Sequence, residues 1–185
     1  MKVLIACEFS GIVRNAFSEL GHDALSCDIL PTEKPGKHYE GDISILLNER
    51  WDLMIAHPPC TYLCNSGVRW LYTQEGRWEK MEEGRAFFMA LFNAKIPRIC
   101  IENPIPHKHA ELPKYSQIIQ PWQFGHGETK GTCLWLKNLP NLLPSNIVNG
   151  RRHIIHYMSP GLERSKNRSR TYTGIASAMA EQWNF

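Results

Sequence analysis

The chain has 185 residues, of which 43% are hydrophobic and 21% charged, and this composition is that of an ordinary soluble globular protein. The length predicts one domain, residues 1–185, with a sizeable core, and no apolar run approaches the length of a membrane span. The opening Met-Lys-Val-Leu-Ile-Ala-Cys is too short and too quickly polar for a signal peptide, so we expect a cytoplasmic protein that binds no membrane.

Strand and helix signals alternate along the chain. Apolar runs predict strands at 3–7, 24–27, 51–56, 98–101 and 134–136, and helical periodicity predicts helices at 12–20, 78–94 and 174–182. Residues 31–37 are rich in proline, lysine and glycine and predict a surface loop. This order predicts an α/β fold of the Rossmann-like kind, with a mostly parallel sheet and helices on both faces.

Residues 52–60 carry an apolar strand into two prolines and then a cysteine. Pro58 and Pro59 must end the strand, because neither can donate a hydrogen bond to a sheet. Cys60 therefore lies just past the carboxyl end of a strand, the edge where open α/β sheets bind ligands. A rigid turn would hold a nucleophilic thiol there; the alternative is a buried structural cysteine.

The other cysteines predict neither disulfides nor a metal site. All six lie in scattered, mostly apolar contexts without the regular spacings of secreted domains, so we expect them to be reduced. Cys60 and Cys64, with His57, His107 and His109, lack the paired short-spaced ligands of structural zinc sites. We therefore predict no metal.

Two features of the first strands suggest a nucleoside-type cofactor. Asp28 follows the second strand, where an acid can accept hydrogen bonds from ribose hydroxyls, and Gly11 lies in the first turn. That turn lacks the three-glycine pattern that cradles a pyrophosphate, so a cofactor without phosphates fits better. S-adenosylmethionine is the commonest such ligand on this architecture.

Six short motifs follow one another in a defined order. They are Phe9-Ser10-Gly11-Ile12, Asp28, Gly41-Asp42-Ile43, Pro58-Pro59-Cys60, Glu102-Asn103, and the closing segment that begins Thr173-Gly174. In this order the chain resembles the cytosine-5 methyltransferases, which transfer a methyl group from S-adenosylmethionine to carbon 5 of cytosine. The resemblance implies that the cofactor is bound by Phe9, Ser10, Gly11, Asp28, Ile29, Asp42, Ile43, Pro58, Thr173 and Gly174.

The resemblance also implies the catalytic roles. The Cys60 thiolate would add to carbon 6 of the ring, Glu102 would hold ring nitrogen 3 and the exocyclic amine, and Asn103 would position that carboxylate. The family motif with two arginines is best matched by residues 128–132, where Lys130 replaces the first arginine and the second is absent. A base within duplex DNA would have to be flipped out of the helix.

The chain departs most from the family in size. Typical members carry a long target-recognition region before the closing helix, and here only a short basic insertion at about 141–170 stands in its place. Small stand-alone members occur in phage and prophage genomes. We expect this insertion to bind the phosphates of DNA, although a solvated loop is the alternative. The basic residues are Arg151, Arg152, Arg164, Lys166, Arg168 and Arg170.

Three hypotheses about function stay open at this point. The first is a minimal cytosine-5 DNA methyltransferase with short or relaxed sequence specificity. The second keeps the chemistry but changes the substrate to a free pyrimidine nucleotide or RNA; a steep salt dependence of binding would favour a polymer. The third is a non-catalytic nucleic-acid-binding module on a methyltransferase scaffold.

Overall fold

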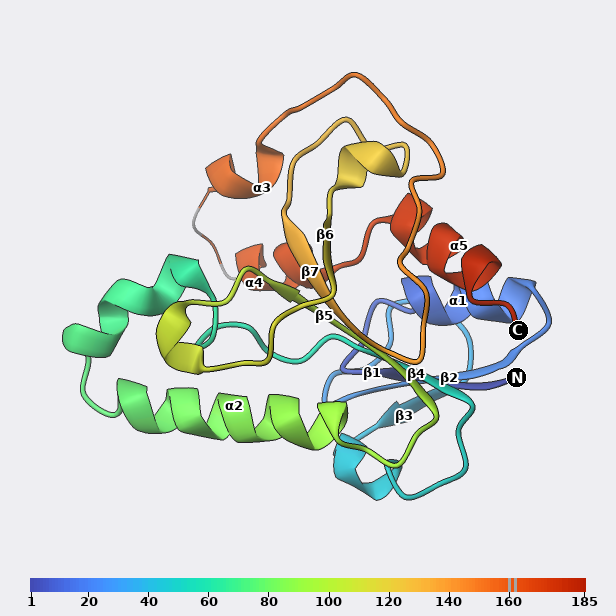
Figure 1. Cartoon of the computed structure of the whole chain (residues 1–185), viewed down its shortest axis with the longest axis horizontal. Coiled ribbons are helices and arrows are strands. Elements are labelled where there is room, and N and C mark those ends of the chain that lie inside the picture. Colours follow the sequence, from blue (N-terminus) through green and yellow to red (C-terminus); the bar gives the residue numbers. More distant parts are fainter. Residues whose placement is uncertain (160, 162) are drawn as a thin grey trace.

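The computed structural model describes residues 1–159, 161 and 163–185, and in them seven strands form one sheet (Figure 1). The strand order is β3-β2-β1-β4-β5-β7-β6. The first five strands of the chain are parallel, and β7 runs antiparallel to both β5 and β6. The strands are β1 (Lys2–Ala6), β2 (Asp23–Asp28), β3 (His38–Glu40), β4 (Leu53–Ala56), β5 (Arg98–Pro104), β6 (Gln117–Ile119) and β7 (Thr132–Lys137).

Helices cover both faces of this sheet. Figure 1 shows α1 (Ile12–Glu19) and α5 (Thr173–Gln182) packed together on one face, and α2 (Arg77–Phe92) on the other. Two short helices, α3 (Ile154–Tyr157) and α4 (Arg164–Ser169), precede α5. The predicted fold, a mostly parallel sheet between helices, is therefore confirmed.

Side-chain alternation along the strands divides the apolar residues into two cores. In β4, Met54 and Ala56 join the core beneath α2, whereas Leu53 and Ile55 join the core beneath α1 and α5. All four are fully buried, as expected for a central strand covered on both faces.

The structure corrects two expectations about the elements. The strand expected at 98–101 continues to Pro104 in β5, because the antiparallel partner β7 extends the ladder to Pro104 opposite Thr132. The strands β3 and β6 and the helices α3 and α4 were also missed. Each spans at most six residues, too short for a clear periodic signal.

The first turn is built around a buried arginine. Cys7 adopts a φ of 58°. The next residue, Glu8, accepts hydrogen bonds through its carboxylate from the backbone N–H groups of Val13 and Arg14, at 2.7 and 3.2 Å. Glu8 thus satisfies free donors at the start of α1. The fully buried Arg14 guanidinium donates to Ser26 and to the carbonyl oxygens of residues 34 and 35, which fixes the 31–37 loop.

Among the described residues no helix is both long enough and apolar enough to cross a membrane.

Arg14 should be required for stability. In Arg14→Met the acceptors that now face the guanidinium lose their partner, and we expect the free energy of unfolding to fall by about 3 kcal/mol. Arg50→Met removes an exposed arginine and should change stability by less than about 0.5 kcal/mol. Urea denaturation of the two variants checks this; equal stabilities would show that Arg14 does not hold the loop.

Candidate functional site

The carboxyl ends of β4 and β5 bring an imidazole and a carboxylate together. Ala56 pairs with Ile101 in the parallel ladder, so His57 and Glu102 occupy the next positions on the same face of the sheet. His57 Nδ1 lies 3.0 Å from Glu102 Oε2, and each side chain is only 10% exposed. Thr171 donates a longer bond, 3.4 Å, to the same carboxylate oxygen.

This contact sets the charge state of both groups. Burial alone would raise the pKa of Glu102, but the hydrogen bond and charge of His57, with help from Lys130 and Thr171, hold that pKa at about 2. Burial would likewise lower the pKa of His57, and the Glu102 carboxylate raises it above its usual value instead. Glu102 is therefore ionised at neutral pH, and its carboxylate favours the protonated form of His57.

Cys60 belongs to a second coupled pair. The backbone N–H of Cys64 donates to the Cys60 carbonyl oxygen at 3.1 Å, and the resulting turn lets the two thiols hydrogen-bond to each other. That bond lowers the pKa of Cys64 to about 5, and the Ser66 hydroxyl, 3.0 Å from the Cys64 sulfur, assists. The same bond, followed by burial, raises the pKa of Cys60. Cys64 is thus the thiol of the pair that ionises first, and its sulfur accepts the hydrogen bond of the Cys60 thiol.

Asn103 makes a different contact from the one expected. Because side chains alternate along a strand, Asn103 faces away from the Glu102 carboxylate. Its amide donates to the Pro58 carbonyl oxygen at 3.3 Å, and its own oxygen is buried without a partner in the described chain. In this structure Asn103 therefore makes no hydrogen bond to the Glu102 carboxylate. His57 and Thr171 position that carboxylate, while Asn103 fixes the proline turn before Cys60.

Lys130 approaches the same edge from the side of β7, the strand next to β5. It lies two residues before β7, whose start pairs with the end of β5. Its ammonium donates to the Arg168 carbonyl oxygen at 3.0 Å, and its charge lowers the pKa of both Glu102 and Cys60. Three predicted catalytic residues, Cys60, Glu102 and Lys130, are thus gathered at one edge.

The first predicted cofactor turn is covered by other parts of the chain. Phe9 is 7% exposed, and the cations of Lys166 and Arg170 lie 5.3 and 5.8 Å from its ring. Both cations pair with Glu33, and Arg170 holds the pKa of that carboxyl at about 2. Ser10 is turned inward, where its hydroxyl donates to Glu8 at 3.0 Å.

Gly11 and Gly174 have structural reasons to be glycine. Gly11 has a φ of +69°, and a Cβ there would lie 2.5 Å from the Arg14 guanidinium. A Cβ on Gly174 would lie 1.8 Å from the Phe124 carbonyl oxygen. Close packing therefore accounts for both residues, and the Gly174 N–H donates to His126 Nε2 at 3.0 Å. The neighbouring Thr173 side chain is exposed and lies 3.3 Å from the same ring nitrogen.

The ends of β2 and β3 suit an adenosine group. Burial raises the pKa of the half-buried Asp28, and the Gly41 N–H donates to the Asp28 carbonyl oxygen, which brings Asp42 to the same edge. Ile29, the residue after Asp28, is 77% exposed, so an apolar side chain is presented next to that acid in the chain. Ribose hydroxyls and a purine face match these groups. Ile43, in contrast, is only 5% exposed and packs in the core beneath α2.

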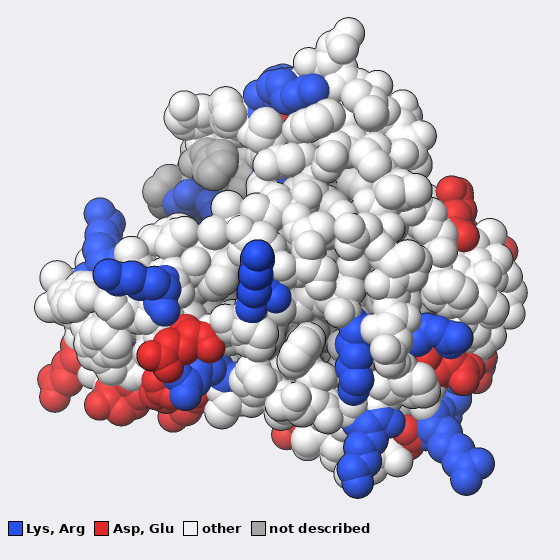
Figure 2. Space-filling view, in the orientation of Figure 1, with Lys and Arg blue, Asp and Glu red and all other residues white. Residues whose placement is uncertain are grey.

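Four of the six predicted phosphate-binding side chains have partners within the chain. Lys166 and Arg170 pair with Glu33, Arg168 donates to the Ile155 carbonyl oxygen, and Arg151 stacks 3.8 Å from the Trp122 ring. Arg152 and Arg164 form no ion pair with any described residue. Figure 2 shows basic side chains scattered over the visible face rather than gathered, and acidic ones over the first half of α2.

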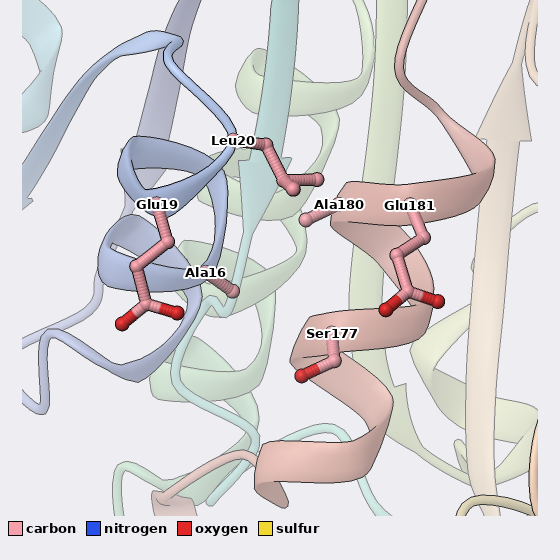
Figure 3. A pocket seen from close by; sticks show the side chains of 6 residues that line it. All are labelled: Ala16, Glu19, Leu20, Ser177, Ala180 and Glu181. Atoms are coloured by element: carbon pink, nitrogen blue, oxygen red, sulfur yellow. The ribbon is translucent and has the colours of Figure 1, made fainter.

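Two cavities differ in what they can hold. Figure 3 shows the crevice between α1 and α5, where Glu19 and Leu20 face Ser177, Ala180 and Glu181; its volume of about 70 Å³ is far below the roughly 300–1,000 Å³ of ligand sites. A second cavity of about 360 Å³ adjoins the site. It is lined by Ile12, His126, Glu128, Ile154, Ile155, Met158, Asn167, Arg170, Thr171, Tyr172 and Thr173.

Sequence reasoning missed several residues that shape this edge. His57 was considered only as a metal ligand, and the described residues contain no group of three or more potential ligands placed for a metal ion. Glu8 and His126 belong to no sequence motif that would have indicated a role at this edge. Glu128 was noted only as part of the lysine motif, yet its carboxylate accepts a 2.7 Å hydrogen bond from the Tyr172 hydroxyl and so helps to fix the segment before α5.

Comparison with known structures identifies the fold. A putative DNA modification methyltransferase encoded within an E. coli prophage is similar, with a TM-score of 0.50 and 13% identity over 86% of this chain and 55% of that one. The methyltransferase EhMeth of Entamoeba histolytica has a TM-score of 0.47 and 14% identity, covering 88% and 61%. This chain thus spans less than two thirds of either protein. No family model and no curated protein matches the sequence.

The sheet order, the antiparallel β7 and the first of these similarities together show a Rossmann-like fold of the kind found in methyltransferases.

The thiol pair predicts a measurable change in reactivity. Removing the Cys64 thiol in Cys64→Ala eliminates the main cause that raises the pKa of Cys60, so Cys60 should be alkylated by iodoacetamide several-fold faster at pH 7. Mass spectrometry of tryptic peptides measures the rates, and the fully buried Cys100 is the internal control for an intact fold. An unchanged Cys60 rate would show that the two thiols do not share a proton.

Proposed function

We propose that this chain is an S-adenosylmethionine-dependent methyltransferase that acts on carbon 5 of cytosine in DNA, with short or relaxed sequence specificity. The observation that carries the proposal is the meeting of Cys60, Glu102 and Lys130 at the sheet edge that also carries Asp28 and Asp42. A nucleophile, a ring-binding carboxylate and a nucleoside-binding surface are the three parts that this reaction requires.

The cofactor, when bound, would supply an electrophilic methyl group. Asp28 and Asp42 would bind its ribose and adenine, and the exposed Ile29 would pack against the purine. The first turn contributes through its shape rather than its side chains, because Phe9 and Ser10 are buried and the Glu8 carboxylate already occupies the N–H groups at the start of α1. Because those N–H groups are not free to bind a phosphate, this end of α1 is consistent with a ligand that has none.

The chain's own residues account for the activation of the pyrimidine. Cys60 gives its proton to the Cys64 thiolate and adds to carbon 6, so that a sulfur–carbon bond forms and electron density moves toward carbon 5 and nitrogen 3. Glu102 holds nitrogen 3 and the exocyclic amine as this charge develops. Lys130 lowers the pKa of Cys60 and so favours the attacking thiolate. After carbon 5 is methylated, its proton passes to solvent, the carbon 5–carbon 6 double bond re-forms, and the sulfur–carbon bond breaks so that Cys60 leaves as the thiolate.

DNA is the substrate that we place first, in line with the name of the prophage protein of similar fold. The insertion at about 141–170 would then replace a target-recognition region, with Arg152 and Arg164 available for phosphates. One observation favours the second candidate, a free pyrimidine nucleotide or RNA. Four of the six basic side chains are already engaged within the chain, which leaves little charge for a long duplex.

A product assay tests the proposal. The protein is incubated with S-adenosylmethionine carrying a deuterated methyl group and, in parallel, with duplex DNA, single-stranded DNA, RNA or dCMP, and the nucleosides are analysed by mass spectrometry. We expect labelled 5-methylcytosine from DNA and a loss of at least about 100-fold in Cys60→Ala and Glu102→Gln.

Glu83→Gln neutralises an exposed carboxylate on α2 and is the matched control, which should keep full activity. Methylation of dCMP or RNA in place of DNA would select the second candidate. If no pyrimidine is labelled in any arm, the chain would be a non-catalytic module on this scaffold.

A further inference from the structure

The mechanism above leaves one buried titratable group without a role. His57 is nine-tenths buried beside the reactive edge, and its backbone N–H extends the β4 ladder by bonding to the Ala6 carbonyl oxygen at 2.9 Å. Nδ1 contacts Glu102, whereas Nε2 has no hydrogen-bond partner among the described residues. A histidine that served only to fill space would be replaced by an apolar side chain at less cost, because burying an unpaired polar atom is unfavourable.

The groups around His57 favour a bound proton. Glu102 touches it, and Glu8 contributes a second negative charge from the end of β1, while Lys130 opposes them from the β7 side. Glu8 is itself neutralised in part by the N–H groups of α1 and the Ser10 hydroxyl. Two carboxylates therefore outweigh one ammonium at the position of the ring.

The proposed chemistry needs an acid at this point. When the Cys60 thiolate adds to carbon 6, the electron pair displaced from the carbon 5–carbon 6 bond is delocalised onto nitrogen 3, which becomes basic. Glu102 faces nitrogen 3 in the proposed mechanism, but an ionised carboxylate has no proton to give. His57 is in direct contact with that carboxylate, through a single 3.0 Å hydrogen bond.

We propose that His57 is the proton-carrying partner of Glu102, so that the pair acts as one acid that protonates nitrogen 3 as Cys60 adds to the ring. This inference rests on the proposed function. The Nδ1 proton passes to the Glu102 carboxylate, and Glu102 then gives that same proton to nitrogen 3, which leaves His57 neutral and Glu102 ionised again. On elimination the sulfur–carbon bond breaks, and the proton on nitrogen 3 returns through Glu102 to His57. The pair of His57 and Glu102 therefore ends the cycle with the proton it began with, while the reaction as a whole releases the proton of carbon 5. His57 acts through Glu102 as a positioning residue.

His57→Asn separates proton carrying from hydrogen bonding. An asparagine amide can place an N–H near the position of Nδ1 and donate to Glu102, but it cannot carry a titrating proton. The measured quantity is the rate at which Cys60 forms an adduct with an oligonucleotide containing 5-fluorocytosine, between pH 5.5 and 9. In the wild type we expect the rate to fall as pH rises through the pKa of His57, which the Glu102 carboxylate raises above its usual value.

In His57→Asn that alkaline limb should disappear, and the rate at pH 7 should be about 100-fold lower. A His57→Asn variant that keeps both the wild-type rate and the alkaline limb would overturn the proposal and leave His57 with a hydrogen-bonding role alone. Thermal melting of the variant shows that it is folded.

A titration that needs no activity tests the pair separately. Nuclear magnetic resonance of the labelled histidine rings gives the pKa of His57, whose signals are assigned by their loss in His57→Asn. We expect that pKa to fall by at least one unit in Glu102→Gln, because the carboxylate raises it. An unchanged pKa would overturn the proposal. If the titration behaves as expected but no pyrimidine forms an adduct with wild-type Cys60, the proposed function fails while the proton-carrying pair stands.

Discussion

The register between β4 and β5 places an ionised carboxylate against an imidazole inside the protein, and the arrangement of the site depends on that contact. A buried charged pair adds little stability compared with two apolar side chains of similar size. Removing one partner alone, in contrast, costs about 3–5 kcal/mol, because the remaining charge is left buried. The pair formed by His57 and Glu102 is therefore explained better by chemistry than by folding.

One segment of the chain contacts both parts of the candidate site. The segment that leads from α4 into α5 contacts the catalytic half through Thr171, which donates to Glu102, and through the Arg168 carbonyl oxygen, which accepts from Lys130. The same segment contacts the turn after β1, because Arg170 pairs with Glu33 and its guanidinium lies 5.8 Å from the Phe9 ring. The end of the short basic insertion thus helps to build the candidate site.

The features that could be predicted from the sequence were those that local patterns encode. Strand ends are marked by prolines and polar residues, so Cys60 and Glu102 could be placed at the sheet edge, and β4 lay within the predicted 51–56 strand. The end of β5 could not be predicted, because its length depends on pairing with β7, about 30 residues later.

Contacts between residues far apart in the sequence could not be predicted from local patterns either. Glu33 and Arg170 are 137 residues apart, and the role of Arg14 depends on carbonyl groups in a loop twenty residues away. His57 lies three residues before Cys60, yet only the register of β4 and β5 shows that it faces Glu102. The contact of Asn103 with the Pro58 carbonyl oxygen could not be predicted for the same reason, since adjacent residues of a strand face opposite sides.

The central claim is that Cys60 attacks a pyrimidine ring, and a covalent trap tests it most directly. The protein is incubated with S-adenosylmethionine and a DNA oligonucleotide in which the target base is 5-fluorocytosine, where fluorine blocks the loss of the group at carbon 5 and stops the reaction at the adduct. Intact-protein mass spectrometry should show one added oligonucleotide that also carries a methyl group, absent in Cys60→Ser and retained in Glu83→Gln. An adduct that persists in Cys60→Ser, or none with DNA, RNA or nucleotide, would contradict the account.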